Sequence, residues 1–205
     1  PYGAGGWSFD TGALNHGRVK DWQLEVYSLI HEHRLKPFLW LAADDSGEIA
    51  GAGMDKWSTY VDHMVDAFED YPIVWVLGLE VDEYWSPEQV AERREYLQSM
   101  TVHPVGVHLT IAETKKTSSS YKDDFDFIMV QFASPQSNAQ YVSNIESYVL
   151  AERPYIAAEF NVSSLGENAE AESTITDRSK AIGKLISEVG DPSKVSGIGN
   201  GILLE

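Results

Sequence analysis

The sequence predicts an α/β fold in which parallel strands are covered by helices, and three observations indicate it. Short apolar runs rich in β-branched and aromatic residues alternate with amphipathic stretches of helical period. The runs are almost continuously apolar, as is typical of parallel strands buried on both faces. No glycine-rich phosphate loop follows a run, since "GEIAGAG" at 47–53 lacks the spacing. A (β/α)8 TIM-barrel-like fold is therefore favoured, and a doubly wound open sheet remains the alternative.

Six apolar runs are predicted as strands, and a seventh strand is expected near "YGAGGWSF" at the N-terminus. A closed barrel of this type has eight strands, so the count indicates a truncated or incomplete barrel. Neither a repeat nor a linker composition divides the chain, and a single catalytic domain over residues 1–205 is expected. The six runs are 37–43, 73–80, 104–111, 125–133, 154–160 and 197–205.

Five amphipathic stretches between the strands are predicted as helices. The helix over 86–100 has the clearest start, because Ser86 is a good N-cap and Pro87 suits the first turn. The polar stretch 112–124 is predicted as a loop or a short helix. The other helices are expected at 19–34, 55–71, 138–153 and 176–190.

The charge and composition limit the partners of the chain. The formal net charge is −17, with 32 acidic and 15 basic residues, which opposes binding to nucleic acid or to anionic membranes. No apolar run approaches the ~20 residues of a membrane-spanning helix. The absence of cysteine excludes disulfides, thiolate metal sites and a cysteine nucleophile. The acidic balance suits a secreted or periplasmic protein, although a cytoplasmic location remains open.

Two predicted strands end in a glutamate, at the edge of a parallel sheet where ligands bind. Glu80 closes "WVLGLE", and Glu159 lies near the end of "PYIAAEF". The period of two places Gly78 on the face of Glu80 and Ala157 on the face of Glu159. A small residue beneath each acid leaves room for a carboxylate that points into a pocket. A solvated strand-end side chain is the alternative for either glutamate taken alone.

The same two segments resemble a known family. "WVLGLE" resembles the fourth-strand signature of clan A retaining glycoside hydrolases, in which an apolar strand ends in Gly-Asn-Glu, and "RPYIAAEFNVSS" is similar to their seventh-strand segment. The resemblance implies hydrolysis of a β-linked oligo- or polysaccharide without a cofactor, with Glu80 as acid/base and Glu159 as nucleophile. Leu79 stands where the family has an asparagine that contacts the sugar 2-hydroxyl. The first strand of the family is also not recognised in the sequence. We therefore expect either a covering segment or an oligomer partner at an open barrel edge, or residues outside this chain that supply the strand.

Further polar and aromatic residues near the strand ends are candidates for substrate binding. Tyr84 and Trp85 are predicted to stack on sugar at the rim of the cleft, while packing onto the helix that follows is the alternative for Trp85. His108 parallels a fifth-strand histidine of some members of the family, although a structural role is slightly favoured for a lone histidine on a strand. Core packing is favoured for Trp40. Asp82 and Glu83 are weaker rivals of Glu80 for the acid role. The complete set of expected substrate-binding residues is Trp7, Asp44, Asp82, Tyr84, Trp85, His108, Gln131 and Asn161.

A metal site is not predicted. In "HEH" at 31–33, the two histidines lie two residues apart on a predicted helix, where their side chains diverge. Two functional alternatives to a glycosidase remain. Leu79 in place of asparagine favours a carbohydrate-binding barrel without catalysis, and Glu80 with His108 suits another β/α-barrel hydrolase or lyase.

Overall fold

The computed structural model describes residues 7–8, 13–42, 51–110, 113, 116, 119–132, 155–160 and 195–198. The backbone divides into two compact units. The first contains residues 1–108 and 120–125, and the second contains residues 109–119 and 126–205. Each unit is described by itself, and the single domain over 1–205 stays a prediction.

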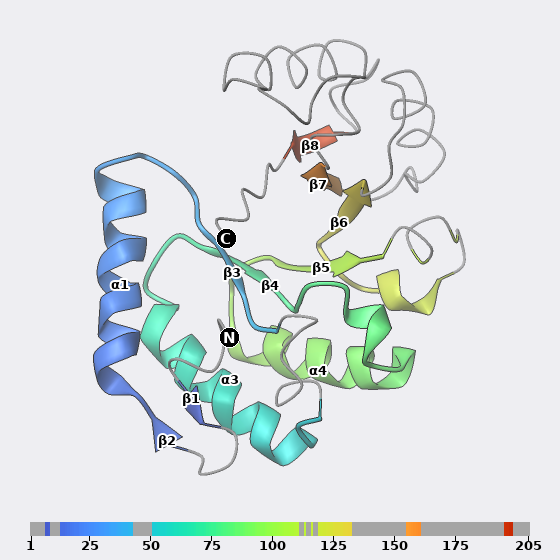
Figure 1. Cartoon of the computed structure of the whole chain (residues 1–205), viewed down its shortest axis with the longest axis horizontal. Helices are drawn as coiled ribbons and strands as arrows, with labels where there is room; N and C mark the ends of the chain where they lie inside the picture. The colour runs from blue at the N-terminus through green and yellow to red at the C-terminus, as the bar shows by residue number, and fades with distance from the viewer. Residues whose placement is uncertain are drawn as a thin grey trace, which may run out of the picture. The chain divides into compact units, whose positions relative to one another are not determined.

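The first unit is built on the parallel strands β3 (Phe38–Trp40), β4 (Val74–Val76) and most of β5 (Val105–Leu109), with β4 in the middle (Figure 1). Trp40 pairs with Val76, and Val76 pairs with Gly106. Backbone hydrogen bonds continue beyond β4, since the N–H of Leu77 donates to Gly106 and that of Leu79 donates to Ala42. The predicted strands are therefore confirmed with shorter limits, and the pairing extends toward Glu80.

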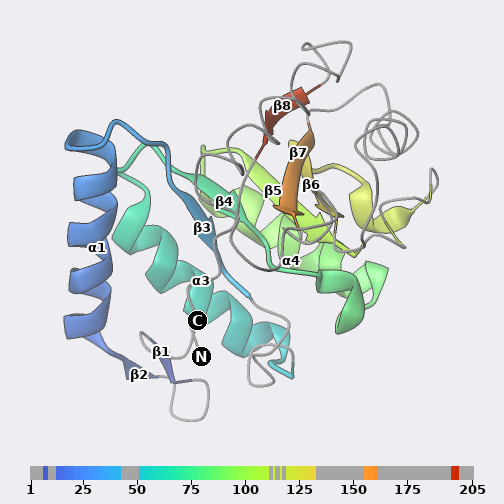
Figure 2. The ribbon, with the colours of Figure 1, turned by 45° about the horizontal axis from the view of Figure 1, so that its top comes forward.

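The helices of this unit are α1 (His16–His31), α3 (Met54–Phe68) and α4 (Pro87–Met100). Helix α3 buries its apolar face, and its Tyr60 hydroxyl donates to the Leu41 carbonyl beside β3 at 3.1 Å. Helices α1 and α3 lie side by side (Figures 1 and 2), joined by a hydrogen bond from Gln23 to the Ala67 carbonyl. Helix α1 begins three residues earlier than predicted because the side chain of Asn15 accepts from the N–H of Arg18.

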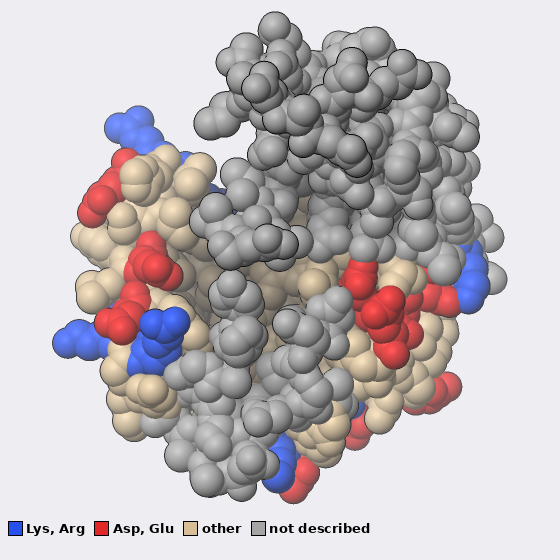
Figure 3. Space-filling model, in the orientation of Figure 1, with Lys and Arg blue, Asp and Glu red and all other residues tan. Residues whose placement is uncertain are grey.

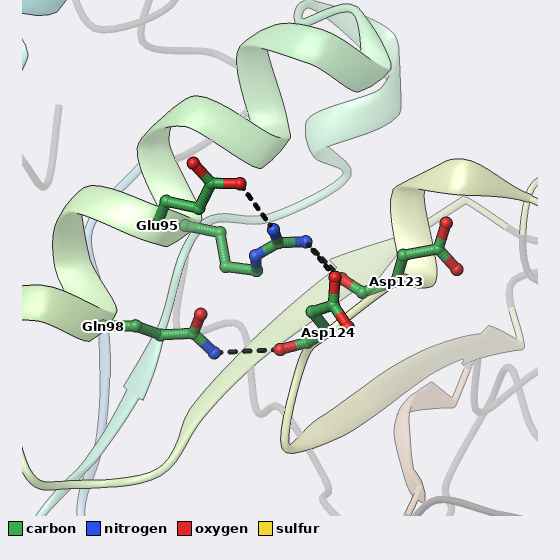
Figure 4. A network of polar contacts seen from close by, with 5 residues as sticks. Glu95, Gln98, Asp123 and Asp124 are labelled. Carbon is green, nitrogen blue, oxygen red and sulfur yellow. Dashed lines mark hydrogen bonds and ion pairs between the residues drawn. The ribbon is translucent and has the colours of Figure 1, made fainter.

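Helix α4 begins as predicted, with Ser86 and Gln89 forming a reciprocal capping box. Its Arg94 anchors the segment that contains the 3-10 turn η2 (Ser120–Lys122). From the same helix, the Gln98 side chain donates to the Asp124 carbonyl at 2.9 Å (Figure 4). The Arg94 guanidinium donates to the Asp123 carbonyl at 2.5 Å and lies 3.6 Å from the Asp124 carboxylate. Within the predicted loop or short helix over 112–124, the structure thus describes a 3-10 turn at Ser120–Lys122.

The second unit contains β6 (Phe127–Phe132), β7 (Tyr155–Phe160) and β8 (Val195–Ile198), all parallel, with β7 in the middle. The predicted strands 125–133 and 154–160 are confirmed. The last strand begins at Val195, two residues before the predicted start. The predicted helices 138–153 and 176–190 lie outside the described residues.

The strand expected near the N-terminus is not a strand of the parallel array. Strand β1 (Trp7–Ser8) instead pairs antiparallel with β2 (Ala13–Leu14) in a separate two-stranded sheet. The connection 9–12 is short, and a short connection permits antiparallel but not parallel pairing. The prediction of a seventh barrel strand there was wrong.

The described surface in Figure 3 carries carboxylates interspersed with basic side chains. Among the described helices, none combines the length and apolar character that crossing a membrane requires.

Candidate active site

Glu80 lies beyond the end of β4, where the backbone pairing with the neighbouring strands stops. Its backbone is left-handed, with φ 47° and ψ 46°, and the residue is 8% exposed. It directly precedes the 3-10 turn η1 (Val81–Glu83), whose Glu83 N–H donates to the Glu80 carbonyl. The structure therefore places a nearly buried glutamate at the carboxyl edge of the parallel strands.

Gly78 makes room for the side chains of the turn that follows Glu80. A Cβ at this position would lie 2.8 Å from the Tyr84 hydroxyl and 2.9 Å from both Ala42 Cβ and Val81 Cγ1. The Tyr84 hydroxyl passes over this glycine and donates to the Leu79 carbonyl at 2.9 Å. The space above Gly78 thus accommodates the turn that follows Glu80, and the placement of the Glu80 carboxylate over this glycine stays a prediction.

His108 on β5 is the side chain that contacts the Glu80 backbone. The N–H of Glu80 donates to His108 Nδ1 at 3.2 Å, so Nδ1 is an unprotonated acceptor and Nε2 carries the proton of the neutral ring. His108 is fully buried, and burial lowers its pKa to about 4. Within the described part of the chain, its Nε2 has no hydrogen-bond partner. His108 is therefore neutral near pH 7, with a defined tautomer.

Trp40 lies beside this histidine. The ring centroids of Trp40 and His108 are 5.5 Å apart, and Trp40 remains 37% exposed. Since Phe38 on the same face of β3 is exposed to the same extent, this face is only partly covered. Trp40 is thus not the core residue that the sequence favoured, and its exposed ring lies next to the candidate site.

Trp85 is a core residue, as the packing alternative expected. It is 2% exposed, and its ring makes edge contacts with Trp57 at 5.1 Å and Tyr84 at 4.9 Å. The guanidinium of Arg93 lies 4.5 Å from its centroid. With its ring in these contacts, Trp85 anchors η1 to α4, whereas Tyr84 is half-buried.

The other expected site residues are only partly described. Asp82 is half-buried within η1, and Glu83 is exposed. Glu159 and Gln131 lie on β7 and β6, and Trp7 lies on β1, with side chains outside the description. Asp44 and Asn161 lie wholly outside the described residues. The structure thus brings Glu80, Tyr84 and His108 together and leaves the contribution of the others as a prediction.

Within the described ranges, no group of three His, Asp or Glu side chains could hold a metal ion. A hollow of about 570 Å³ lies along α3, and it contains none of the expected site residues. Its Glu69 carboxylate already accepts hydrogen bonds from Thr101 and Val102. The lining residues are Asp62, His63, Val65, Asp66, Glu69, Asp70 and Met100.

Sequence reasoning missed Arg93, which is 2% exposed and lies on α4. Its Nη2 donates to the Ala52 carbonyl at 2.7 Å, which joins α4 to the segment before α3. Burial lowers the pKa of Arg93 and outweighs the opposing charge of Glu92. The "ERREY" segment gave no signal of this role, because arginines on an amphipathic helix ordinarily point to solvent.

Comparison with known proteins defines the class of fold. No protein-family model matches the sequence, and no curated protein matches it significantly. Solved structures do match, and glycoside hydrolases are among them. The chain therefore has a glycoside hydrolase-like α/β fold with parallel strands.

The matching structures share little sequence identity with this chain. A candidate glycoside hydrolase from Bacteroides vulgatus superposes with a TM-score of 0.65 at 12% identity, over 95% of this chain and 37% of that protein. A family 113 β-mannanase from Alicyclobacillus acidocaldarius gives a TM-score of 0.58 at 11% identity, over 89% of this chain and 66% of the enzyme. A β-1,4-mannanase of the same family gives 0.58 at 16% identity, over 89% and 67%. The likeness establishes the fold alone, and this chain spans little more than a third of the first protein.

Proposed function

We propose that the chain is a glycoside hydrolase that cleaves a β-linked oligo- or polysaccharide with retention of configuration. The observation that carries the proposal is the position of Glu80. It is nearly buried at the carboxyl edge of the parallel strands, where ligands bind in β/α folds, and its backbone is bound to His108. The glycoside hydrolase-like fold supports this assignment.

The proposed chemistry needs two carboxyl groups with different roles. Glu80, protonated, donates its proton to the oxygen of the leaving group, while ionised Glu159 attacks the anomeric carbon. The glycosyl–enzyme ester is then hydrolysed by a water from which Glu80 removes a proton. A retaining pair stands about 5–5.5 Å apart and an inverting pair roughly 6.5–9.5 Å apart. A measured separation of the Glu80 and Glu159 carboxyls beyond about 10 Å would refute both geometries.

The substrate panel follows from the exposed aromatic surface and from the fold neighbours. Trp40 offers an apolar ring on which a sugar can stack, next to His108. Since β-mannanases are among the similar structures, β-1,4-mannan is the first polysaccharide to test, together with aryl β-glycosides and plant, algal and bacterial glycans.

Substitution of each acid tests its role. Glu159→Ala is expected to abolish turnover, and azide should restore it with formation of a glycosyl azide. Glu80→Gln should slow aryl glycosides with poor leaving groups far more than those with good ones, because only the former need the proton. Glu83→Gln is the matched control, since Glu83 lies in the same turn but is exposed, and its activity should be unchanged. Full activity of Glu159→Ala would contradict the assignment of the nucleophile.

A carbohydrate-binding protein without catalysis is the second candidate, and Leu79 favours it. The Leu79 side chain has no amide with which to contact a sugar hydroxyl. Its backbone N–H donates to the Ala42 carbonyl, and its backbone carbonyl accepts from the Tyr84 hydroxyl. Calorimetric binding of glycans by the wild-type chain without turnover, over the whole panel, would support this candidate and refute the glycosidase.

A further inference from the structure

The backbone conformation of Glu80 is unfavourable and must be held by its surroundings. A residue with a side chain in the left-handed region costs on the order of 1 kcal/mol relative to its ordinary conformations. Glycine or asparagine usually occupies such positions, because these residues tolerate the left-handed region better than a glutamate such as Glu80 does. Neighbouring contacts must therefore select the conformation that sets the direction of the Glu80 side chain.

Hydrogen bonds to the backbone restrain this turn on both sides of Glu80. The Leu79 N–H donates to the Ala42 carbonyl, and the Leu79 carbonyl accepts from the Tyr84 hydroxyl. The Glu80 carbonyl accepts from the N–H of Glu83. The remaining backbone group is the Glu80 N–H, which donates to a side-chain atom, His108 Nδ1, at 3.2 Å.

His108 is itself rigidly placed. Its backbone N–H donates to the Gly78 carbonyl at 3.3 Å, so the histidine and the turn are joined both through the backbone and through the ring. The ring is fully buried beside Trp40, and burial favours its neutral form. A neutral ring is required, because a protonated Nδ1 could not accept the Glu80 N–H.

We propose that His108 is a positioning residue that aims the Glu80 side chain by accepting the Glu80 backbone N–H at Nδ1. The inference rests on the proposed function for its effect on catalysis. It also assigns the ring nitrogens, since Nδ1 is occupied by the backbone and Nε2–H can act only as a donor. His108 is then not the base of a hydrolase or lyase, the role that one alternative gave it.

The variants are chosen by the position of the acceptor. In His108→Asn, the amide oxygen lies close to the place of Nδ1 and can still accept the Glu80 N–H. In His108→Leu, the side chain fills similar space without an acceptor. His103→Leu is the matched control at the opposite end of β5, where the His103 ring bonds the Glu69 carbonyl.

The first measurement is independent of catalysis. Hydrogen exchange of the Glu80 amide, followed by NMR, should be unchanged in His108→Asn and His103→Leu and about tenfold faster in His108→Leu, as the loss of one hydrogen bond predicts. In the wild type, the ¹⁵N spectrum of His108 at pH 7 should show Nδ1 unprotonated and Nε2 protonated. This measurement needs no variant, so it tests the inference even if His108→Leu does not fold.

The second measurement is kinetic. His108→Leu should lower kcat on an aryl β-glycoside about 10- to 100-fold with KM nearly unchanged, as expected for a misplaced catalytic group, and His108→Asn should restore most of kcat. An equal loss in the Asn and Leu variants, an unchanged exchange rate in His108→Leu, or an Nδ1-protonated wild-type ring would overturn the inference. A wild-type chain without activity on any glycan would refute the proposed function instead, while the exchange and ¹⁵N results would still decide whether His108 holds Glu80.

Discussion

Replacement of Gly78 by alanine tests how tightly the turn after β4 is packed. The added Cβ would lie 2.8 Å from the Tyr84 hydroxyl and 2.9 Å from Ala42 Cβ and Val81 Cγ1. Carbon atoms in ordinary contact stand ~3.5–4.0 Å apart, so all three neighbours are too close. Two of them belong to buried residues with little freedom to move. The substitution must therefore shift η1 or the strand.

The expected cost follows from the overpacking of a closed core, which is about 1–3 kcal/mol. An alanine also restricts the unfolded chain and would by itself stabilise the protein by roughly 0.4–1 kcal/mol. The net loss in the free energy of unfolding is thus about 1–2 kcal/mol. Gly17→Ala in α1 is the matched control, because its added Cβ would meet only Asn15 Oδ1, at 3.5 Å. This control should keep or slightly raise stability.

A double variant identifies the contact responsible. Tyr84→Phe alone should cost about 1 kcal/mol, because it removes the hydrogen bond to the Leu79 carbonyl. It also removes the atom nearest to the new Cβ, so Gly78→Ala with Tyr84→Phe should cost less than the sum of the single changes. The rescue should be partial, since Ala42 and Val81 remain close.

Urea unfolding followed by circular dichroism measures these four free energies, with constant m-values as the check of two-state behaviour. Strict additivity in the double-mutant cycle would refute the close approach of the Tyr84 hydroxyl to Gly78. A Gly78→Ala protein as stable as the Gly17→Ala control would refute the packing of the whole turn.

Three further predictions concern stability. Burial lowers the pKa of His108 from its ordinary 6.5 to about 4. The stability that depends on the neutral His108 ring is therefore complete above pH 6.5 and is lost as the pH falls through 4. The difference in unfolding free energy between wild type and His108→Asn should therefore shrink by about 3 kcal/mol from pH 7 to below pH 4, and a constant difference would contradict it. Ser86→Ala removes the cap of α4 and should cost about 1 kcal/mol in urea unfolding, whereas Ser99→Ala near the other end of the helix should cost less. Arg93→Met removes the hydrogen bond to the Ala52 carbonyl and the contact with Trp85 and should cost about 1–3 kcal/mol; an unchanged free energy would show that the buried guanidinium contributes nothing.

Local patterns were sufficient to predict most of the described elements. The runs that form β3 to β7 are almost continuously apolar and bounded by polar segments, and Ser86-Pro87 marks the start of α4 within one residue. The limits of the first two predicted helices differ from those observed by one to three residues. In α1, the cap by Asn15 sets the start and the left-handed backbone of Arg34 lies just beyond the end, and hydrophobic period does not predict either feature. The hairpin of β1 and β2 was missed since its two-residue strands show no periodicity.

The candidate site, too, could be predicted from the sequence only in part. The sequence by itself determined that glutamates lie near the ends of two strands, because strand period and composition are local properties. Only the tertiary structure decided that Trp40 is exposed and Trp85 buried, since the exposure of a ring depends on which segments pack against it. The same holds for Glu80. The Glu80 backbone is left-handed, and its N–H is hydrogen-bonded to His108, which lies 28 positions further along the chain. The pairing of strands brings these two residues together, and no spacing in the sequence predicts such a contact.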